Sequence, residues 1–147
     1  MTDDPRAIRL LQAPRLVHGH GRYLDDLPDD GAMYAVFVRS TRPHAIIKAV
    51  DASAALALAG VLGVYTHSDL ESWGVLRLPV GWCVPGQRVT DNPLLADQRV
   101  RFVGEPIAAV LAATPYIAED AASLIEVDYD ALPAVAQADR ALDEGCT

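Results

Sequence analysis

The residues that could hold a metal ion gather in the first 30 positions of the sequence. His18 and His20 form a His-x-His pair, which on a strand would present both imidazoles to one side, as a zinc site requires. A site needs a full ligand set, and no third ligand has an identifiable position. Four carboxylates follow nearby, at Asp25, Asp26, Asp29 and Asp30. They lack the regular alternation and the terminal Glu of a calcium-binding loop. We therefore expect a solvated acidic turn and no metal site.

The other histidines and the two cysteines form no recognisable catalytic pattern. His44 and His67 lie near the ends of candidate strands, beside no Ser, Cys or Asp in a known nucleophile arrangement, so we expect surface or edge histidines. Cys83 and Cys146 lack the Cys-x2-Cys spacing of metal sites, which favours two free thiols, with a disulfide as the alternative. Segment 19–21, Gly-His-Gly, lacks the third glycine of a dinucleotide-binding turn. No catalytic or cofactor-binding residue is predicted.

The sharpest local feature is the tripeptide Gly104, Glu105 and Pro106. Its carboxylate lies between a residue that frees the backbone and one that stiffens it. Glu105 could orient neighbouring N–H groups or form a salt bridge with Arg99 or Arg101. It could also be a general base, but no partner for that role is visible in the sequence. Because buried charges are usually paired, we predict a structural role for the tripeptide.

Composition restricts the functions that this chain can have. Its 147 residues fit one domain, and its formal net charge of −8 argues against binding to nucleic acid or to an anionic membrane surface. No segment approaches the roughly 18 apolar residues that a membrane span needs. The sequence begins Met-Thr-Asp-Asp-Pro, without the basic and apolar regions of a signal peptide. We expect a cytoplasmic protein.

The positions of these residues depend on a mixed series of strands and helices. Runs rich in β-branched and aromatic residues predict strands at 33–40, 45–50, 61–65, 99–103, 107–112 and 126–130. The run 107–112 is nearly all apolar, as in a strand buried on both faces, whereas 126–130 alternates like an edge strand. Asp51 is expected to cap a short helix over 52–59 that stops at Gly60.

Two further helical segments follow from capping signals. Residues 68–71 are typical of a single turn. Thr114 and Pro115 mark the start of a helix whose apolar face includes Ala118 and Ala121. The predicted fold class is α+β, with a mixed sheet and one or two packed helices.

We predict three regions along the chain. Residues 1–32 form an extended, irregular N-terminal arm, 33–135 form the domain, and 136–147 form a C-terminal tail. Within the domain, 72–93 is an irregular stretch that holds three glycines, three prolines, both tryptophans and Cys83. A loop this long inside a compact domain is either functional or disordered.

Several segments resemble, in the same order, motifs of one enzyme family. They are GRYLDD at 21–26, AVFVRS at 35–40, PHA at 43–45, GVLGVYT at 60–66, PLLA at 93–96, VRFVGEPIAAV at 100–110 and EVDYDALPAV at 126–135. No single motif is specific, but the ordered set extends over roughly residues 15–142. The set resembles the large subunit of molybdenum hydroxylases, the family of xanthine dehydrogenase, aldehyde oxidase and carbon monoxide dehydrogenase. The resemblance implies the α/β hammerhead domain of that subunit.

The resemblance also implies a larger assembly. In this family the large subunit binds the molybdopterin cofactor, and partner domains or subunits carry iron–sulfur clusters and FAD. The enzymes hydroxylate substrates such as aldehydes and N-heterocycles with oxygen from water, or oxidise carbon monoxide. The cofactor-binding segments and the catalytic glutamate lie in later domains of the large subunit, so none can be carried over to this chain. We expect the chain to bind no cofactor and to be inactive alone.

One functional link to the active site is expected. In the family the loop before the PLLA segment reaches the substrate funnel, and 72–93 is the corresponding loop here. Trp73, Trp82 and Val89 are therefore candidates for lining the substrate channel. The alternative is that both tryptophans pack on other domains, since apolar residues on a loop are expected at an interface.

Three hypotheses follow for the chain as a whole. The first is a hammerhead domain or split subunit that completes a molybdenum-dependent oxidoreductase. The second is a free-standing module for protein interaction or small-molecule binding that has lost the chemistry. The third is the product of a truncated gene. Recovery of a molybdopterin-binding partner with the native protein separates the first from the others.

Overall fold

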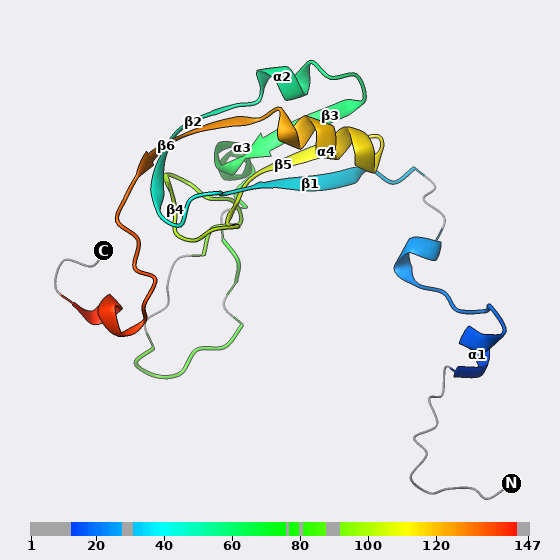
Figure 1. Ribbon diagram of the computed structural model, residues 1–147, viewed down its shortest axis with the longest axis horizontal. Coiled ribbons are helices and arrows are strands. Elements are labelled where there is room, and N and C mark those ends of the chain that lie inside the picture. The colour runs from blue at the N-terminus through cyan, green and yellow to red at the C-terminus, as the bar shows by residue number, and fades with distance from the viewer. Residues whose placement is uncertain (1–12, 28–30, 76, 80, 88–91, 144–147) are drawn as a thin grey trace, which may run out of the picture. The chain divides into compact units, whose positions relative to one another are not determined.

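The computed structural model describes residues 13–27, 31–75, 77–79, 81–87 and 92–143. The chain divides into two compact units, Met1–Ala32 and Met33–Thr147 (Figure 1). Two small sheets and three helices of the second unit hold most of the secondary structure. None of the helices in the described residues is long and apolar enough to cross a membrane.

The first sheet has the strand order β1-β5-β3, with both strand pairs antiparallel. Its strands are β1 (Tyr34–Arg39), β3 (Val61–Thr66) and β5 (Pro106–Ala112). The central position of β5 explains its apolar sequence, because a strand flanked on both sides and covered by a helix exposes little of either face. Ile107, Ala108, Val110 and Ala112 are all buried.

The second sheet has the order β4-β2-β6 and is also antiparallel. Its strands are β2 (Ala45–Asp51), β4 (Arg99–Val100) and β6 (Glu126–Ala131). An irregularity in register falls between Ile47 and Ala49, opposite β6. As predicted, β6 is an edge strand, and its acidic side chains at alternate positions remain exposed.

Helix α4 (Pro115–Ser123) covers one face of the first sheet (Figure 1). It begins as predicted, with Pro115 in its first turn and the Thr114 hydroxyl accepting a hydrogen bond of 3.2 Å from the backbone N–H of Ile117. Ala118 and Ala121 are fully buried where α4 meets the sheet. Their short side chains let the helix approach the strands closely.

Two shorter helices flank β3. Helix α3 (His67–Ser72) starts with a capping box, in which the Asp69 side chain accepts from the backbone N–H of Thr66 at 2.7 Å. Helix α2 (Ser53–Leu56) is a single turn, shorter than the predicted 52–59. Asp51 belongs to β2, although its carboxylate still accepts from the backbone N–H of Ser53 at 2.9 Å. The chain then turns at Gly60, whose φ of 93° suits glycine.

The core consists of two clusters built largely from alanine and β-branched residues. One contains Ala45, Ala96, Val100 and Ile107, and the other contains Ala55, Val110, Ala121 and Ile125. Val50 and Val127 are half-buried and pack against both clusters, so they connect the two sheets.

The structure corrects two predictions about the sheets. The fold class is α+β as expected, but the single mixed sheet was wrong, because the strands form two antiparallel sheets. The predicted strand 99–103 shrinks to Arg99–Val100. It ends there because the backbone N–H of Arg101 donates to the side chain of Glu105 instead of to a neighbouring strand.

The first unit contains α1 (Ala13–Val17) and the 3-10 turn η1 (Leu24–Asp26), so the predicted irregular arm does hold some helix. None of its described residues is buried. In the predicted C-terminal tail, the 3-10 turn η2 (Asp139–Leu142) is exposed throughout.

Truncation of Ile107 tests the importance of the first cluster. Ile107 is among the largest fully buried side chains, so Ile107→Ala is expected to lower the free energy of unfolding by about 2–5 kcal/mol through lost burial and a residual cavity. Urea unfolding followed by circular dichroism measures the change. The control is Leu62→Ala on β3, where the side chain is 54% exposed and the expected change is within about 0.5 kcal/mol. Equal changes in the two variants would contradict this account of the core.

Candidate functional site: the Gly-Glu-Pro corner and the 72–93 loop

The Gly104–Pro106 tripeptide forms a corner that continues the pairing of β1 and β5 beyond the strands. The backbone N–H of Gly104 donates to the Ser40 carbonyl at 2.8 Å, and that of Ser40 donates to the Glu105 carbonyl at 2.9 Å. Gly104 has a φ of 92°, a conformation that few other residues tolerate. Its carbonyl accepts from the Arg39 guanidinium at 3.0 Å. The corner is therefore fixed from two positions on the β1 side.

Glu105 is only 5% exposed, and its carboxylate is held by Arg101. One oxygen accepts from the Arg101 guanidinium at 2.9 Å, and the other accepts from the Arg101 backbone N–H. Of the two arginines that the sequence offers, Arg101 forms the ion pair with this carboxylate. The same guanidinium donates to the Arg99 carbonyl at 3.2 Å and to the Asp97 carboxylate at 3.2 Å. Arg101 thus joins β4, the corner and the segment before β4.

Hydrogen bonds and charges in this network shift the pKa of Asp97 and that of Arg101. Partial burial would raise the pKa of Asp97, but hydrogen bonds from the Gln98 backbone and from Arg101 outweigh it and hold the pKa below its ordinary 3.8. Burial would likewise lower the pKa of Arg101, but its hydrogen bonds with Glu105 and Asp97 raise the pKa instead. The network favours the charged form of both side chains.

Pro106 connects the corner to the PLLA segment. Its carbonyl accepts from the backbone N–H of Ala96 at 2.7 Å, and Leu95 and Ala96 are both buried. A proline suits this position because only its carbonyl takes part in the contact with Ala96, and proline has no backbone N–H to donate at the start of β5. The corner therefore touches β1, β4, β5 and the end of the 72–93 loop.

Two of the four histidines have hydrogen-bond partners in the domain. His44 Nδ1 lies 2.8 Å from the Pro133 carbonyl, and His67 Nδ1 lies 3.1 Å from the Leu95 carbonyl. The rings of His18 and His20 are 6.4 Å apart, and Asp25, Asp29 and Asp30 have no described side chain. Over the described residues, no three His, Cys, Asp or Glu side chains are placed to bind a metal ion. Cys83 is exposed, and Cys146 lies outside the described residues.

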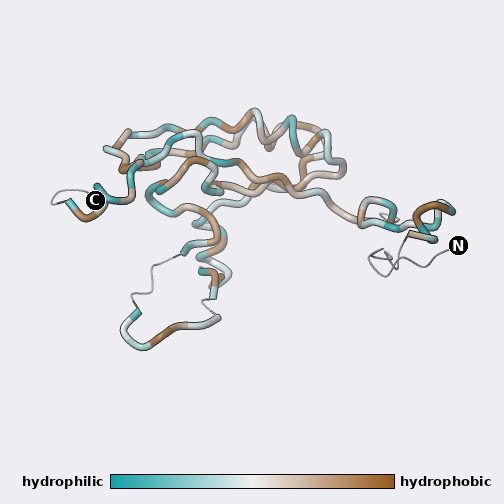
Figure 2. The backbone as a smooth tube through the Cα atoms, turned by 60° about the horizontal axis from the view of Figure 1, so that its bottom comes forward, coloured by the Kyte–Doolittle hydropathy of each residue, from teal (hydrophilic) through white to brown (hydrophobic). Residues whose placement is uncertain are grey.

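The 72–93 loop presents apolar side chains to solvent. Trp73, just after α3, packs against Tyr65 with ring centroids 5.2 Å apart, while Trp82 is 78% exposed. The two arms of the loop meet at a bridge between Arg77 and Pro93 and at a 3.0 Å hydrogen bond from Leu78 N–H to the Asn92 carbonyl. Figure 2 shows the loop running away from the sheets with an apolar stretch near its end. Val89 lies outside the described residues.

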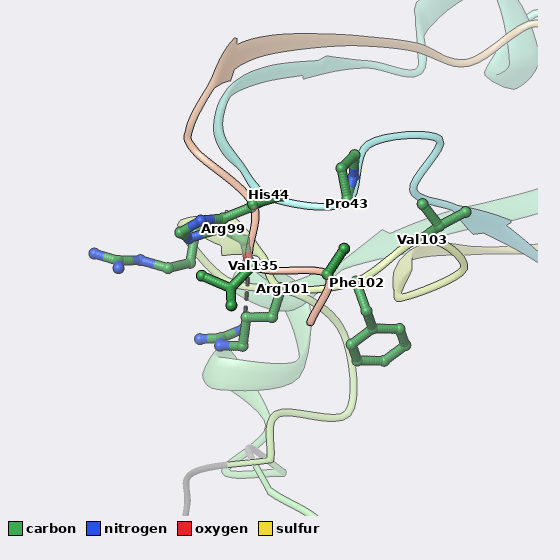
Figure 3. A pocket seen from close by; sticks show the side chains of 9 residues that line it. Pro43, His44, Arg99, Arg101, Phe102, Val103 and Val135 are labelled. Carbon is green, nitrogen blue, oxygen red and sulfur yellow. Dashed lines mark hydrogen bonds between the residues drawn. The ribbon is translucent and has the colours of Figure 1, made fainter. Parts of the chain in front are cut away.

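Two grooves beside the corner were not anticipated from the sequence. One, of about 490 Å³, is lined from three segments: 43–44, 134–136, and residues 99 and 101–103 (Figure 3). We name it the Phe102 groove. The other, of about 610 Å³, lies between Leu78, Pro93, Phe102 and Glu105. Their signal in the sequence is the apolar pair Phe102 and Val103 before Gly104, which the predicted strand 99–103 includes.

Substitution of Glu105 tests the corner. Glu105→Gln keeps the shape but presents an amide N–H₂ to donors of Arg101, so the free energy of unfolding should fall by about 1–3 kcal/mol. Urea unfolding measures the loss, and Glu119→Gln on the exposed face of α4 is the matched control. A loss no larger than that of the control would show that the corner contributes nothing to stability.

Acid titration tests the Asp97 contact. The pKa of Asp97 is lower in the folded protein than its ordinary value of 3.8. The ionised Asp97 side chain therefore stabilises the fold above pH 3.8, and this stabilisation is lost as the pH falls through the lowered pKa. The free energy of unfolding of Asp97→Asn should therefore fall less between about pH 6 and about pH 3 than that of the unsubstituted protein. Asp139→Asn in η2 is the control. Parallel curves for the protein and for Asp97→Asn would refute the coupling.

Comparison with known proteins places this geometry in one family. The family described as "Aldehyde oxidase and xanthine dehydrogenase, a/b hammerhead domain" matches residues 18–133. The chain is 37% identical over 129 residues to the carbon monoxide dehydrogenase large chain of Afipia carboxidovorans, covering 88% of this chain and 15% of the relative. It is also 37% identical over 131 residues to the nicotine 6-hydroxylase large subunit of Paenarthrobacter nicotinovorans, covering 89% and 16%.

Solved structures agree with the sequence relatives. A crystal structure of the Cu,Mo-CO dehydrogenase superposes with a TM-score of 0.81 and 34% identity, over 93% of this chain and 16% of that chain. Quinoline 2-oxidoreductase from Pseudomonas putida 86 superposes with a TM-score of 0.80 and 40% identity, over 90% and 17%. The chain thus spans about a sixth of the length of these relatives. It belongs to the aldehyde oxidase and xanthine dehydrogenase family, as an α/β hammerhead domain.

Proposed function

We propose that this chain serves as the hammerhead part of a molybdopterin-dependent hydroxylase or dehydrogenase and is not catalytic alone. The observation that carries the proposal is the family match over residues 18–133, in a chain that spans about a sixth of its relatives. The reaction assigned to the complete enzyme is oxidation of an aldehyde, an N-heterocycle or carbon monoxide. We take 33–135 as the hammerhead domain proper, with 1–32 as an arm and 136–147 as a tail.

An iron–sulfur cluster does not fit the described residues of this chain. An iron–sulfur cluster needs several cysteine thiolates, and the described residues contain one cysteine, the exposed Cys83. Nor does the described part offer a cluster of metal-binding side chains. We therefore assign molybdopterin, iron–sulfur clusters and FAD to other domains or subunits of the same enzyme. No catalytic step is assigned to a residue of this chain.

We assign a structural role to Gly104, Glu105 and Pro106. The support is that Glu105 is buried and that both of its oxygens accept hydrogen bonds from Arg101. A carboxylate used in this way orders the loop that leads into β5. A general base would instead need a free oxygen directed at a substrate.

We assign the lining of a substrate channel to Trp73, Trp82 and Val89. The support is the exposure of apolar side chains on the 72–93 loop, where a monomeric domain would gain by placing polar residues. Trp73 is packed on Tyr65 and is therefore the more rigid of the two described candidates. Trp82 is free to contact a substrate or another domain.

The cytoplasm is the location that we propose for the enzyme. The exposed thiol of Cys83 suits a reducing compartment. The proposed partner is the molybdopterin-binding domain or subunit of the same enzyme, with iron–sulfur and FAD subunits in the complete complex.

Co-expression tests the central proposal. The 147-residue chain is produced with the polypeptide of the same organism that carries the molybdopterin-binding domains. We expect the two to co-purify, molybdenum to appear in the complex, and oxidoreductase activity to require both. Oxidase or dehydrogenase activity of the chain alone would contradict the non-catalytic role. A stable chain that captures no such polypeptide would favour a free-standing module.

Kinetics of the complex test the channel. Trp82→Ala should raise KM or lower kcat/KM by several-fold, with molybdenum content unchanged, because the residue would guide substrate and would not hold the cofactor. Tyr116→Ala is a matched control, since Tyr116 on α4 is 77% exposed and Trp82 is 78% exposed. If both variants keep the kinetics of the unsubstituted complex, Trp82 does not line the channel.

A further inference from the structure

The Phe102 groove combines an apolar surface with positive charge. Its apolar part comes from Pro43, Phe102, Val103 and Val135, and its cationic part comes from Arg99 and Arg101 (Figure 3). Phe102 is 55% exposed and Val103 is 62% exposed, so two large apolar side chains of one loop face solvent. The Arg101–Glu105 contact fixes the loop that carries them. One of the three segments that line the groove is thus held by an ion pair.

The charge of the groove contrasts with that of the whole chain. The net charge is −8, yet none of the residues that line the groove is a carboxylate. The charge of Arg101 is offset by Glu105 and Asp97. Arg99 is exposed and makes no ion pair in the described part of the chain. Arg99 and Asp130 both pair with Ile46 of β2, from opposite sides, but they form no ion pair with each other. Arg99 therefore adds an unpaired positive charge at the His44 side of the groove, opposite Phe102 and Val103 (Figure 3).

The other groove of the corner differs in this respect. It is lined by Arg101 together with the Glu105 carboxylate, so its charges are already paired. A third groove, between β2 and α3, is lined by Lys48 but also by Glu71 and Asp97. Of these three grooves, the Phe102 groove alone combines exposed apolar side chains with positive charge that the groove itself does not balance.

We propose that the Phe102 groove is the docking site for an extended apolar segment that carries a carboxylate, contributed by the molybdopterin-binding domain or subunit of the same enzyme. The identity of this occupant rests on the proposed function; its chemistry rests on the groove. The apolar residues of the segment cover Phe102 and Val103, and its carboxylate pairs with Arg99. Aromatic and arginine side chains are the usual anchors of protein interfaces.

A second copy of this chain fits the groove less well. Two acidic chains of net charge −8 repel one another, and a symmetric contact would bring Arg99 of each copy towards the other. A segment from the molybdopterin-binding part of the enzyme avoids this meeting of like charges.

Measured affinity tests the proposal in the protein as it exists. The 147-residue chain is titrated with the purified molybdopterin-binding polypeptide by calorimetry, at low and at high salt. Phe102→Ser should weaken binding at least about tenfold, because it removes the apolar anchor. Arg99→Glu should weaken binding about threefold to tenfold and reverse or flatten the salt dependence, because it replaces an attractive charge with a repulsive one.

Matched controls lie outside the groove. Leu62→Ser removes an apolar side chain that is 54% exposed on β3, close to the 55% of Phe102, and Arg140→Glu reverses an exposed charge in η2. Both should bind like the unsubstituted chain. Circular dichroism and Tm establish that each variant is folded. If Phe102→Ser does not fold, the surface variant Arg99→Glu decides the question through its salt dependence.

The outcomes separate this proposal from the proposed function. Normal binding by Phe102→Ser and Arg99→Glu overturns the groove as a docking site and leaves the proposed function standing. No binding by the unsubstituted chain rejects both. Self-association of the chain that Phe102→Ser abolishes would make the groove an interface between copies, which also overturns the proposal.

Discussion

The contact between Arg101 and Glu105 is the constraint on which the Gly-Glu-Pro corner of this domain depends. By accepting the Arg101 backbone N–H, the carboxylate ends β4 after Val100 and closes a loop of fixed shape. That loop then directs Phe102 and Val103 outward and places Gly104 beside the end of β1. Removing Arg101 would leave the buried Glu105 carboxylate without the partner that both of its oxygens use. The pair therefore acts mainly by fixing one geometry.

Small side chains make the rest of the fold compatible with this corner. Fully buried alanines let α4 and the crossing strands come close enough to form a core without many large residues. Val50 and Val127 then pack against both clusters and couple the two sheets. Ile107 of β5 also packs with Ala45 and Val100 of the second sheet, so the core and the corner both hold the two sheets together.

Most local elements could be predicted because their signals are local. The cap and proline of α4 and the alternation of β6 each depend on a few neighbouring residues. The length of β4, the division into two sheets and the Phe102 groove depend on partners far along the chain, such as Ser40 with Glu105. The sequence predicted that Glu105 pairs with Arg99 or with Arg101. The folded structure shows that the partner is Arg101. Family motifs, which encode such long-range contacts indirectly, predicted the hammerhead fold better than periodicity did.

The distribution of exposed apolar side chains bears on whether the domain acts alone. A free-standing module would gain solubility from polar residues at Trp82, Phe102 and Val103, where nothing in the described core requires apolar ones. Instead, these side chains lie on two loops attached to the same corner, through Pro93 to Ala96 on one side and Arg101 to Glu105 on the other. A rigid support beneath exposed apolar loops is what a domain needs in order to pack against, and shape, a neighbouring active site. The architecture thus favours a part of a larger enzyme over a module that has lost its chemistry.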